Sequence, residues 1–319
     1  MKILIVKTSS MGDIIHAFPI VSDILYAYPQ ARIHWLAEES FSSVVSLHPS
    51  IRKVHVCAFR RWRRSLLHRD VWREMKQLAQ RLRAEAFDLV IDEQGLLRSA
   101  WIASWTKAPV HGFSKDTVRE PLATRFYQKT YSIHENEGAV RRYRMLAAAV
   151  LSYPMPKTPP HFALQACADV SVTQKKPYVS LVVNTSREEK LWPERNWIAL
   201  GQKWHEHGYT SVLYWGNAQE KERVQRIAAQ IPDSVVAPRR SLDRTAVWLQ
   251  QGSVMIGVDT GLAHLAAALG VPCVGIFVST RTDILHLIGD GACVSLGDVG
   301  KVPTLEEVWQ TSSSLLSVK

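Results

Sequence analysis

The sequence predicts an α/β protein of two domains, each built on an open parallel sheet. Apolar, strand-like runs alternate with helical patterns along the 319-residue chain, which is the signature of βαβ units. The pattern breaks at residues 153–160, which contain four prolines, and then starts again. Because proline continues neither a helix nor a central strand, we place the domain linker there. The predicted domains are residues 1–156 and 157–319.

In both halves of the chain, predicted strands alternate with predicted helices. In the first half, strands are expected at 2–6, 33–37, 53–56, 89–92 and 110–113, with helices that include 71–85 and 141–151. In the second half, strands are expected at 178–183, 211–214, 254–256 and 273–276, with helices at 194–207, 218–230, 242–250, 260–269 and 304–316. Ligands bind at the carboxyl ends of the strands in such sheets, so we expect a cleft where the two sheets face one another.

Composition narrows the class of protein. Hydrophobic residues make up 46% of the chain and charged residues 21%, as in ordinary globular proteins. We find no apolar run of about eighteen residues that would span a bilayer, and residues 1–6 are too short for a secretory signal. The four cysteines are far apart without a C-x-x-C pair, which favours neither a zinc site nor disulfides. We therefore expect a cytoplasmic protein without metal or cofactor.

The net charge of +10 is distributed unevenly. Residues 1–160 carry 24 Lys and Arg against 14 Asp and Glu, whereas the remainder carries 15 of each. A one-sided positive field attracts an anionic partner to that half. Nucleic acid, an anionic membrane face and a phosphorylated lipid are the candidates, and a merely soluble basic surface is the alternative.

The first predicted strand leads into the segment Lys-Thr-Ser-Ser-Met-Gly-Asp at residues 7–13. Neither G-x-G-x-x-G nor a Walker pattern is present, which argues against a nicotinamide dehydrogenase and a P-loop enzyme. Asp13 falls at or near a helix start. It is either a helix cap or a general base at the cleft, and the residues alone favour neither. A cap by Ser9 or Ser10 would leave Asp13 free.

A helix opens directly after the strand at 254–256. The backbone amides of Thr260, Gly261 and Leu262 would point out of its N-terminus, where the helix dipole favours anions. Asp259 would repel a phosphate, so it fits better as a cap or as an acceptor for sugar hydroxyls. His264 lies in the first turn, where a packing role is the commoner one.

A second loop of this kind follows the strand at 178–183. Thr185, Ser186 and Lys190 offer two hydroxyls and one cation for a phosphate, although the mixed charges between them also fit a solvated loop. Farther along, Glu220 could accept hydrogen bonds from ribose hydroxyls, but a surface helix glutamate is the commoner case.

The densest basic run, at residues 60–64, contains Arg60, Arg61, Arg63 and Arg64. Arginine pairs with phosphate and carboxylate through two parallel hydrogen bonds, and Trp62 and Trp72 add side chains that suit a membrane interface. Arg119 is a candidate for extending this patch. Charge runs are usually solvated faces, so the run alone is weak support for a binding site.

Seven segments in order resemble the heptosyltransferases of the lipopolysaccharide core pathway, glycosyltransferase family 9. They are Lys-Thr-Ser-Ser-Met-Gly-Asp at 7–13, Arg-Arg-Trp-Arg at 60–63, Asp-Glu-Gln-Gly-Leu at 92–96, Arg-Glu-Pro-Leu-Ala at 119–123, Lys-Leu-Trp-Pro at 190–193, Trp-Gly at 215–216 and Asp-Thr-Gly-Leu-Ala-His-Leu at 259–265. The first two are similar to the type I members of the family.

The resemblance implies a GT-B fold, in which two Rossmann-like domains face one another across a cleft. It implies an inverting transfer of L-glycero-D-manno-heptose from ADP-heptose to Kdo of Kdo2-lipid A. The N-terminal domain would bind the acceptor at the cytoplasmic face of the inner membrane, and the C-terminal domain would bind the ADP-sugar. No nucleic acid is expected as a partner, since no motif that reads it is present.

The resemblance also implies roles for residues. Asp13 matches the general base. The donor-binding set is Thr185, Ser186, Lys190, Glu220, Asp259, Thr260, Gly261, Leu262 and His264. The acceptor-binding set is Lys7, Arg60, Arg61, Arg63, Arg64 and Arg119. Two places depart from the family pattern, namely Arg240 near the expected adenine and residues 278–282, where a Gly-Pro-Thr-Asp-like loop is usual.

Three rival functions remain open at this stage. A type II heptosyltransferase would use a heptosylated acceptor. An assay that exchanges one lipid acceptor for the other distinguishes it from a type I enzyme. A sugar-nucleotide epimerase of similar fold would convert the donor without any acceptor. A non-catalytic protein that binds anionic lipid through the arginine run would show salt-sensitive binding without release of ADP.

Overall fold

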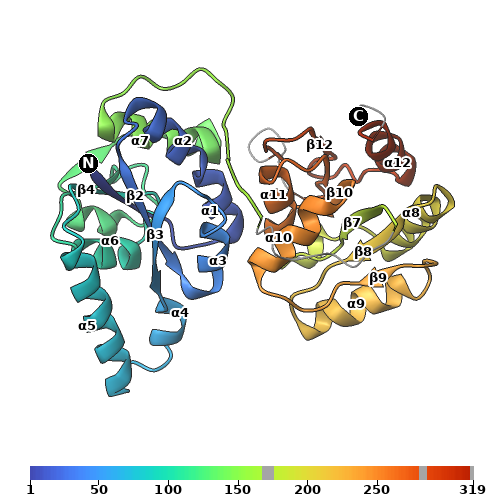
Figure 1. Cartoon of the computed structure of the whole chain (residues 1–319), viewed down its shortest axis with the longest axis horizontal. Helices are drawn as coiled ribbons and strands as arrows, with labels where there is room; N and C mark the ends of the chain where they lie inside the picture. Colours follow the sequence, from blue (N-terminus) through green and yellow to red (C-terminus); the bar gives the residue numbers. More distant parts are fainter. Residues whose placement is uncertain (167–175, 280–285, 317–319) are drawn as a thin grey trace. The chain divides into compact units, whose positions relative to one another are not determined.

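The computed structural model describes residues 1–166, 176–279 and 286–316. The chain forms two compact units, Met1–Ala163 and Leu164–Lys319, here called the first and second domains (Figure 1). The first domain extends beyond the predicted linker because the residues after it pack there. The Ser22 hydroxyl donates to the carbonyl of His161, and Phe162 is fully buried.

The first domain contains a sheet of six parallel strands in the order β3-β2-β1-β4-β5-β6. The strands are β1 (Lys2–Val6), β2 (Arg32–Glu38), β3 (Ile51–Cys57), β4 (Leu89–Asp92), β5 (Val110–Phe113) and β6 (Lys129–Tyr131). This is the Rossmann order. The five predicted strands are confirmed, whereas the short edge strand β6 was not predicted.

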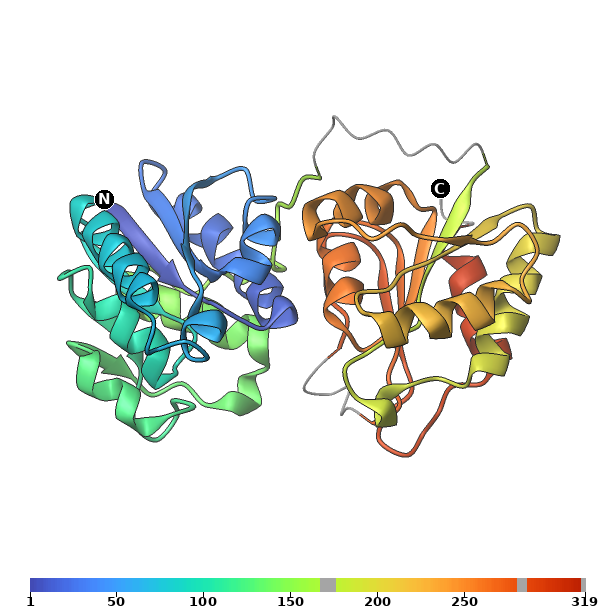
Figure 2. The same ribbon diagram turned by 90° about the horizontal axis from the view of Figure 1, so that it is seen from below.

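Helices cover both faces of this sheet (Figures 1 and 2). Under α4 (Phe59–Trp62), α5 (Arg69–Ala84) and α6 (Leu97–Ser104), a core joins Leu4 and Leu36 of the sheet to Leu78 of α5. The other layer consists of α1 (Met11–Ala17), α2 (Pro19–Ala27), α3 (Ser42–Val45) and α7 (Ala139–Leu151). Three short 3-10 helices complete the domain, namely η1 (Glu39–Phe41), η2 (Pro121–Phe126) and η3 (Glu135–Glu137).

A buried ion pair holds α7 to α2. Arg144 Nε and Nη2 donate to the two carboxylate oxygens of Asp23 at 2.7 and 3.0 Å, and Nη1 donates to the carbonyl of Thr158 at 3.1 Å. Breaking such a pair leaves an uncompensated buried charge. Arg144 therefore connects α7, α2 and the proline-containing segment in one arrangement.

The second domain repeats the same topology. Its sheet has the order β12-β11-β10-β7-β8-β9, again with all strands parallel. The strands are β7 (Tyr178–Val182), β8 (Thr210–Leu213), β9 (Val235–Val236), β10 (Val254–Val258), β11 (Cys273–Ile276) and β12 (Cys293–Leu296). The four predicted strands are confirmed. The two strands at the edges, β9 and β12, were not predicted.

The helices of the second domain match the five predicted ones to within about two residues, the usual scatter of helix ends. They are α8 (Glu194–Glu206), α9 (Ala218–Ala228), α10 (Leu242–Gln251), α11 (Gly261–Ala268) and α12 (Leu305–Ser314). The described part of this domain also contains a 3-10 turn, η4 (Glu188–Lys190). The core on one face contains three fully buried tryptophans, Trp192, Trp197 and Trp204. Among the helices that the structure describes, none has the length and apolar character needed to cross a membrane.

Both sheets place a topological switch point at their carboxyl edge. The strand order reverses between β1 and β4 in the first domain and between β7 and β10 in the second. Such a reversal opens a crevice in which ligands of doubly wound folds bind. The loops that follow these four strands are therefore where functional side chains are expected.

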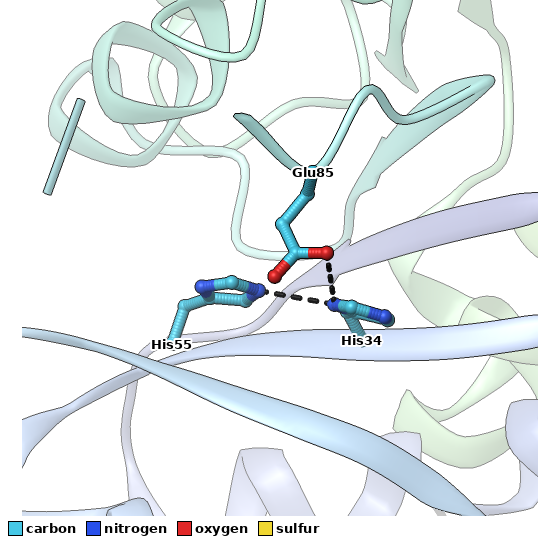
Figure 3. Close-up of side chains that lie close together, drawn as sticks. All are labelled: His34, His55 and Glu85. Atoms are coloured by element: carbon cyan, nitrogen blue, oxygen red, sulfur yellow. Dashed lines mark hydrogen bonds and ion pairs between the residues drawn. The ribbon is translucent and has the colours of Figure 1, made fainter. Parts of the chain in front are cut away.

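A cluster of two histidines and a glutamate lies beneath the C-terminal end of α5, near the amino end of β1 (Figure 3). His34 Nδ1 lies 3.1 Å from His55 Nε2 and 3.9 Å from Glu85 Oε2. It is the one group of described residues with metal-ligand spacing. Lys2 and Lys53 already bind the two Glu85 oxygens at 3.2 and 2.6 Å, so the carboxylate is neutralised by side chains and we assign the cluster a packing role.

This cluster predicts that acid destabilises the first domain. Burial lowers the pKa of His55 from 6.5 to about 4, and it also lowers the pKa of His34. The unfolded chain therefore takes up protons before the folded chain does, and stability is lost as pH falls from about 6.5 toward about 4, with His55 accounting for about 3 kcal/mol at most.

Urea unfolding between these pH values measures the effect. We expect the midpoint for wild type to fall with pH more steeply than that for His55→Gln, whereas the exposed-histidine control His68→Gln should follow wild type. Equal slopes for wild type and His55→Gln would contradict the assignment.

Candidate active site

Asp13 is the third residue of α1, directly after the loop that leaves β1. Its Oδ2 accepts hydrogen bonds from the backbone N–H and the hydroxyl of Ser10 at 2.9 and 2.7 Å. Its Oδ1 lies 3.5 Å from the Tyr143 hydroxyl of α7. The expectation that a serine cap leaves Asp13 free is therefore wrong, since Asp13 takes part in the capping box with Ser10. One oxygen caps the helix, while the other contacts the Tyr143 hydroxyl.

The electrostatic surroundings keep Asp13 ionised. Burial raises its pKa, but the charge of Lys7 and the two hydrogen bonds from Ser10 outweigh burial, and the pKa lies below its usual value of 3.8. Asp13 is therefore a carboxylate at neutral pH. A carboxylate held in one orientation at the edge of a sheet has the state and the position that a general base requires.

The source of that charge is the ammonium of Lys7, which is buried at the carboxyl end of β1. Lys7 Nζ donates to the Tyr143 hydroxyl at 2.7 Å and to the Glu93 carbonyl at 2.9 Å. Burial lowers the pKa of Lys7, and the carboxylates of Asp13 and Glu93 oppose this. The resemblance placed Lys7 among acceptor-binding residues, but its hydrogen bonds are made inside the domain, so we assign it an electrostatic role toward Asp13.

Glu93 is a second carboxyl group at this edge and was not singled out from the sequence. It is fully buried, and neither carboxylate oxygen has a hydrogen-bond partner among the described residues. Burial raises the pKa of Glu93 well above its usual value, and the nearby Lys7 charge opposes this. The signal in the sequence is its place, the first residue after β4, which is the neighbour of β1 at the switch point.

Neighbouring polar residues fix the loops after β1 and β4 to one another. Gln94 Oε1 accepts from the backbone N–H groups of Thr8 and Ser9, both at 2.9 Å. Asp92 accepts from the Ser99 hydroxyl at 2.9 Å and from the Tyr127 hydroxyl at 2.8 Å. Because both loops are tied by buried hydrogen bonds, Asp13 rests on a rigid support.

The predicted acceptor-binding arginines differ in how far they are already engaged. Arg61 forms ion pairs with Glu39 and Glu74 at 3.3 and 2.9 Å, so it holds the α4–α5 segment together. The Arg60 guanidinium lies over the Phe41 ring, 5.2 Å from its centroid. The others, which are exposed and form no ion pair within the described part of the chain, are Arg63, Arg64 and Arg119.

The second domain brings several predicted donor-binding residues together at its own switch point. Asp259, one residue after β10, binds Lys190 Nζ at 2.5 Å, and His264 Nε2 lies 3.6 Å from its other carboxylate oxygen. The Thr185 hydroxyl donates to the Asp259 carbonyl at 3.2 Å. The expectation that Asp259 caps the helix is wrong, because Thr260 occupies the N-cap of α11. Asp259 instead holds the Lys190 ammonium beside that helix start.

The N-terminus of α11 offers backbone donors next to this ammonium. The side chain of the N-cap residue Thr260 forms no capping hydrogen bond, and the first residues of the helix, Gly261 and Leu262, are half-buried. Unbonded amides at a helix start carry a partial positive charge and suit an anion such as a phosphate. Together with Lys190 they form an arrangement that fits a diphosphate.

The remaining predicted donor-binding residues have other surroundings. Glu220 lies in the first turn of α9, where its carboxylate accepts from the Gly216 N–H at 2.7 Å. Ser186 is exposed. The Arg240 guanidinium lies 5.2 Å from the centroid of the Trp248 ring. Residues 278–282 differ from the family pattern, and of these, residues 280–282 lie outside the described residues.

Comparison with known proteins gives a consistent result. The model of Glycosyltransferase family 9 (heptosyltransferase) matches residues 75–312. The chain is 40% identical to Lipopolysaccharide heptosyltransferase 1 of Pseudomonas aeruginosa over 285 residues, which cover 88% of this chain and 79% of that protein.

Two solved structures of the E. coli heptosyltransferase WaaC are similar over both domains. The structure with ADP is 32% identical with a TM-score of 0.91, covering 99% of this chain and 100% of that one. The structure with ADP-2-deoxy-2-fluoro heptose is 33% identical with a TM-score of 0.85, covering 97% and 98%. The GT-B fold is thereby confirmed. The chain belongs to glycosyltransferase family 9, the heptosyltransferase family.

Proposed function

We propose that this chain is a type I heptosyltransferase. It moves L-glycero-D-manno-heptose from ADP-heptose to a hydroxyl of Kdo in Kdo2-lipid A, a step of lipopolysaccharide inner-core synthesis. The observation that carries the proposal is the position of the Asp13 carboxylate, which two hydrogen bonds from Ser10 fix at the carboxyl edge of the first sheet in a member of this family. Kdo2-lipid A is anionic, and the free arginines of the first domain have the charge to bind it.

The proposed reaction is a single displacement. Asp13 removes the proton of the Kdo hydroxyl as that oxygen forms a bond to the anomeric carbon of heptose. The bond from this carbon to the diphosphate oxygen breaks, and ADP leaves with the electron pair. The new bond forms on the face opposite to the leaving group, so the configuration inverts. Asp13 needs to be ionised before the reaction starts, and the Lys7 charge ensures this.

The second domain stabilises the leaving group in this proposal. Lys190 and the α11 amides of Gly261 and Leu262 face the diphosphate, where negative charge develops as the bond breaks. Asp259 holds the ammonium of Lys190 in position before the donor binds. Thr185, Ser186, Glu220 and His264 complete the proposed donor site, with Glu220 turned toward the ribose.

The basic first domain is proposed to dock on the cytoplasmic face of the inner membrane without spanning it. Arg60, Arg63, Arg64 and Arg119 would bind the phosphates and carboxylates of the acceptor. Their exposure leaves the guanidinium groups accessible to a charged surface, and each such contact is screened by salt.

Replacing the base tests the proposal. Asp13→Asn keeps the size of the side chain and removes its basicity, so we expect kcat for acceptor-dependent ADP release to fall by about 10²–10⁴-fold. The assay contains ADP-heptose and Kdo2-lipid A, with a control that omits the acceptor.

The matched control for this substitution is Asp116→Asn. Asp116 is also a carboxylate that accepts a serine hydroxyl, from Ser132 at 3.0 Å, and this variant should retain wild-type activity. Full activity of a folded Asp13→Asn would contradict the role of Asp13. Conversion of ADP-heptose to an isomeric ADP-sugar without acceptor would favour an epimerase, and release of ADP without acceptor would show hydrolysis of the donor. Activity confined to a heptosylated acceptor would favour type II.

The Lys7 charge predicts a shift in the pH profile. Lys7 lowers the pKa of Asp13, so Lys7→Met should raise that pKa and move the acid limb of kcat/KM to higher pH, because a general base is lost as pH falls through its pKa. Measuring kcat/KM as a function of pH across the acid range gives the position of this limb. Lys115→Met, which removes an exposed lysine, should leave it in place, and an unmoved limb in an active Lys7→Met would disprove the coupling.

The role of Lys190 predicts a loss of leaving-group stabilisation. Lys190→Met should lower kcat by about 10²–10³-fold, the usual effect of removing one oriented donor from a developing anion, and should weaken ADP binding. Lys203→Met is the control, since Lys203 pairs with Glu306 at 2.8 Å elsewhere in the second domain. Calorimetry with ADP and steady-state kinetics give the two quantities, and unchanged values for both would rule out the contact.

A further inference from the structure

An apolar pocket of about 440 Å³ lies within the first domain, between the α4–α5 segment and α6. Eight aromatic and aliphatic side chains line it: Phe59, Trp62, Leu66, Trp72, Met75, Leu97, Trp101 and Phe126. The charged residues among those that line it are Arg63 and Arg98. This volume is within the usual range for sites of small ligands, and the lining accepts an apolar group.

The surface next to the pocket is also apolar and is exposed to an unusual degree. Leu67 is 99% exposed, Trp72 55% and Leu66 49%. Neighbouring exposed apolar residues mark sites of interaction with a membrane or a partner, and tryptophan suits the boundary between apolar and polar phases. The pocket and these side chains belong to one segment, which continues from α4 into the start of α5.

Positive charge borders the same pocket. Arg63 is exposed and Arg98 half-exposed, and neither forms an ion pair with an acidic residue within the described ranges. The Arg98 guanidinium lies 5.6 Å from the centroid of the Phe59 ring. An apolar cavity with cationic groups beside it is complementary to an amphiphile that has an anionic head and a hydrocarbon chain.

The pocket lies on the sheet edge that carries Asp13. The α4 helix begins two residues after β3, and α6 begins five residues after β4, while Asp13 follows β1. Because these strands are parallel, their carboxyl ends meet at one edge. A lipid whose sugar head approaches Asp13 therefore has an apolar site for its chain on the same side of the first domain.

We propose that this pocket holds one acyl chain of the lipid acceptor, with an acidic group of that lipid against Arg63 and Arg98. The inference rests on the proposed transfer to a lipid acceptor and adds a subsite for the hydrocarbon. It makes recognition of the acceptor depend on the lipid chain as well as on the sugar head.

Direct binding of dodecyl phosphate to the full-length chain, without nucleotide, tests the pocket by calorimetry below the concentration at which micelles form. We expect about one bound molecule per chain and no comparable binding of inorganic phosphate. Leu66→Asp and Leu97→Asp each place a charge at a half-exposed lining position. They should weaken binding about tenfold or more, because the bound alkyl chain would cover the new carboxylate and remove it from water. Val299→Asp, at a 58% exposed valine of the second domain, is the control and should bind as wild type does.

The transfer assay then tests whether the hydrocarbon chain that the pocket binds belongs to the lipid acceptor. Leu66→Asp should raise the KM for Kdo2-lipid A about tenfold or more while leaving the KM for the fully deacylated acceptor unchanged. Equal binding of dodecyl phosphate by wild type, Leu66→Asp and Leu97→Asp would overturn the pocket assignment. Weakened binding with an unchanged KM for Kdo2-lipid A would assign the pocket to another lipid and overturn the acceptor subsite. Absence of transfer with either acceptor would refute the proposed function, a result that the dodecyl phosphate assay does not depend on.

Discussion

The buried ammonium of Lys7 is the interaction on which the arrangement of the first domain depends. A charge removed from water needs oxygen atoms around it, and Lys7 obtains them from the Glu93 carbonyl after β4 and the Tyr143 hydroxyl on α7. These contacts join the first strand of the sheet to a strand and a helix that come much later in the chain. The same charge lowers the pKa of Asp13, so one buried group both organises the edge of the sheet and prepares the carboxylate there.

The second domain also holds a lysine ammonium in a fixed position, but beside a helix N-terminus. Lys190 and Asp259 pair at 2.5 Å next to the N-terminus of α11, so a cation is held beside backbone amides that also favour an anion. In the first domain the buried cation acts on a carboxylate of the protein. In the second domain the cation is close to the surface, with 18% of its side chain exposed, where an external phosphate can reach it. Two domains of equal topology thus offer the proposed base in one case and a candidate anion site in the other.

The central strands could be predicted from the sequence because parallel strands that are buried on both faces form continuous apolar runs. The three missed strands lie at sheet edges. β6 is Lys-Thr-Tyr and largely exposed, and β9 has only two residues, so neither has an apolar run to detect. The place of Asp13 after β1 predicted either a helix cap or a general base, and the residues alone favoured neither. The structure shows the capping contacts with Ser10, and the role of general base is a proposal. Glu93 and Tyr143 were missed because their contacts with Lys7 depend on tertiary packing between residues 86 and 136 positions apart in the sequence.

The central claim is that the folded protein holds Asp13 as a carboxylate through the charge of Lys7. Carbon-13 NMR of the Asp13 carboxyl carbon, recorded during a pH titration, tests it most directly, with the resonance assigned by comparison with Asp13→Asn. The account predicts a titration midpoint for this resonance below the ordinary value of an aspartate, about 3.9, because the Lys7 charge and the hydrogen bonds from Ser10 lower the pKa of Asp13. A titration midpoint above about pH 4 would contradict the account, because Asp13 would then behave as a buried carboxyl group without the support of Lys7.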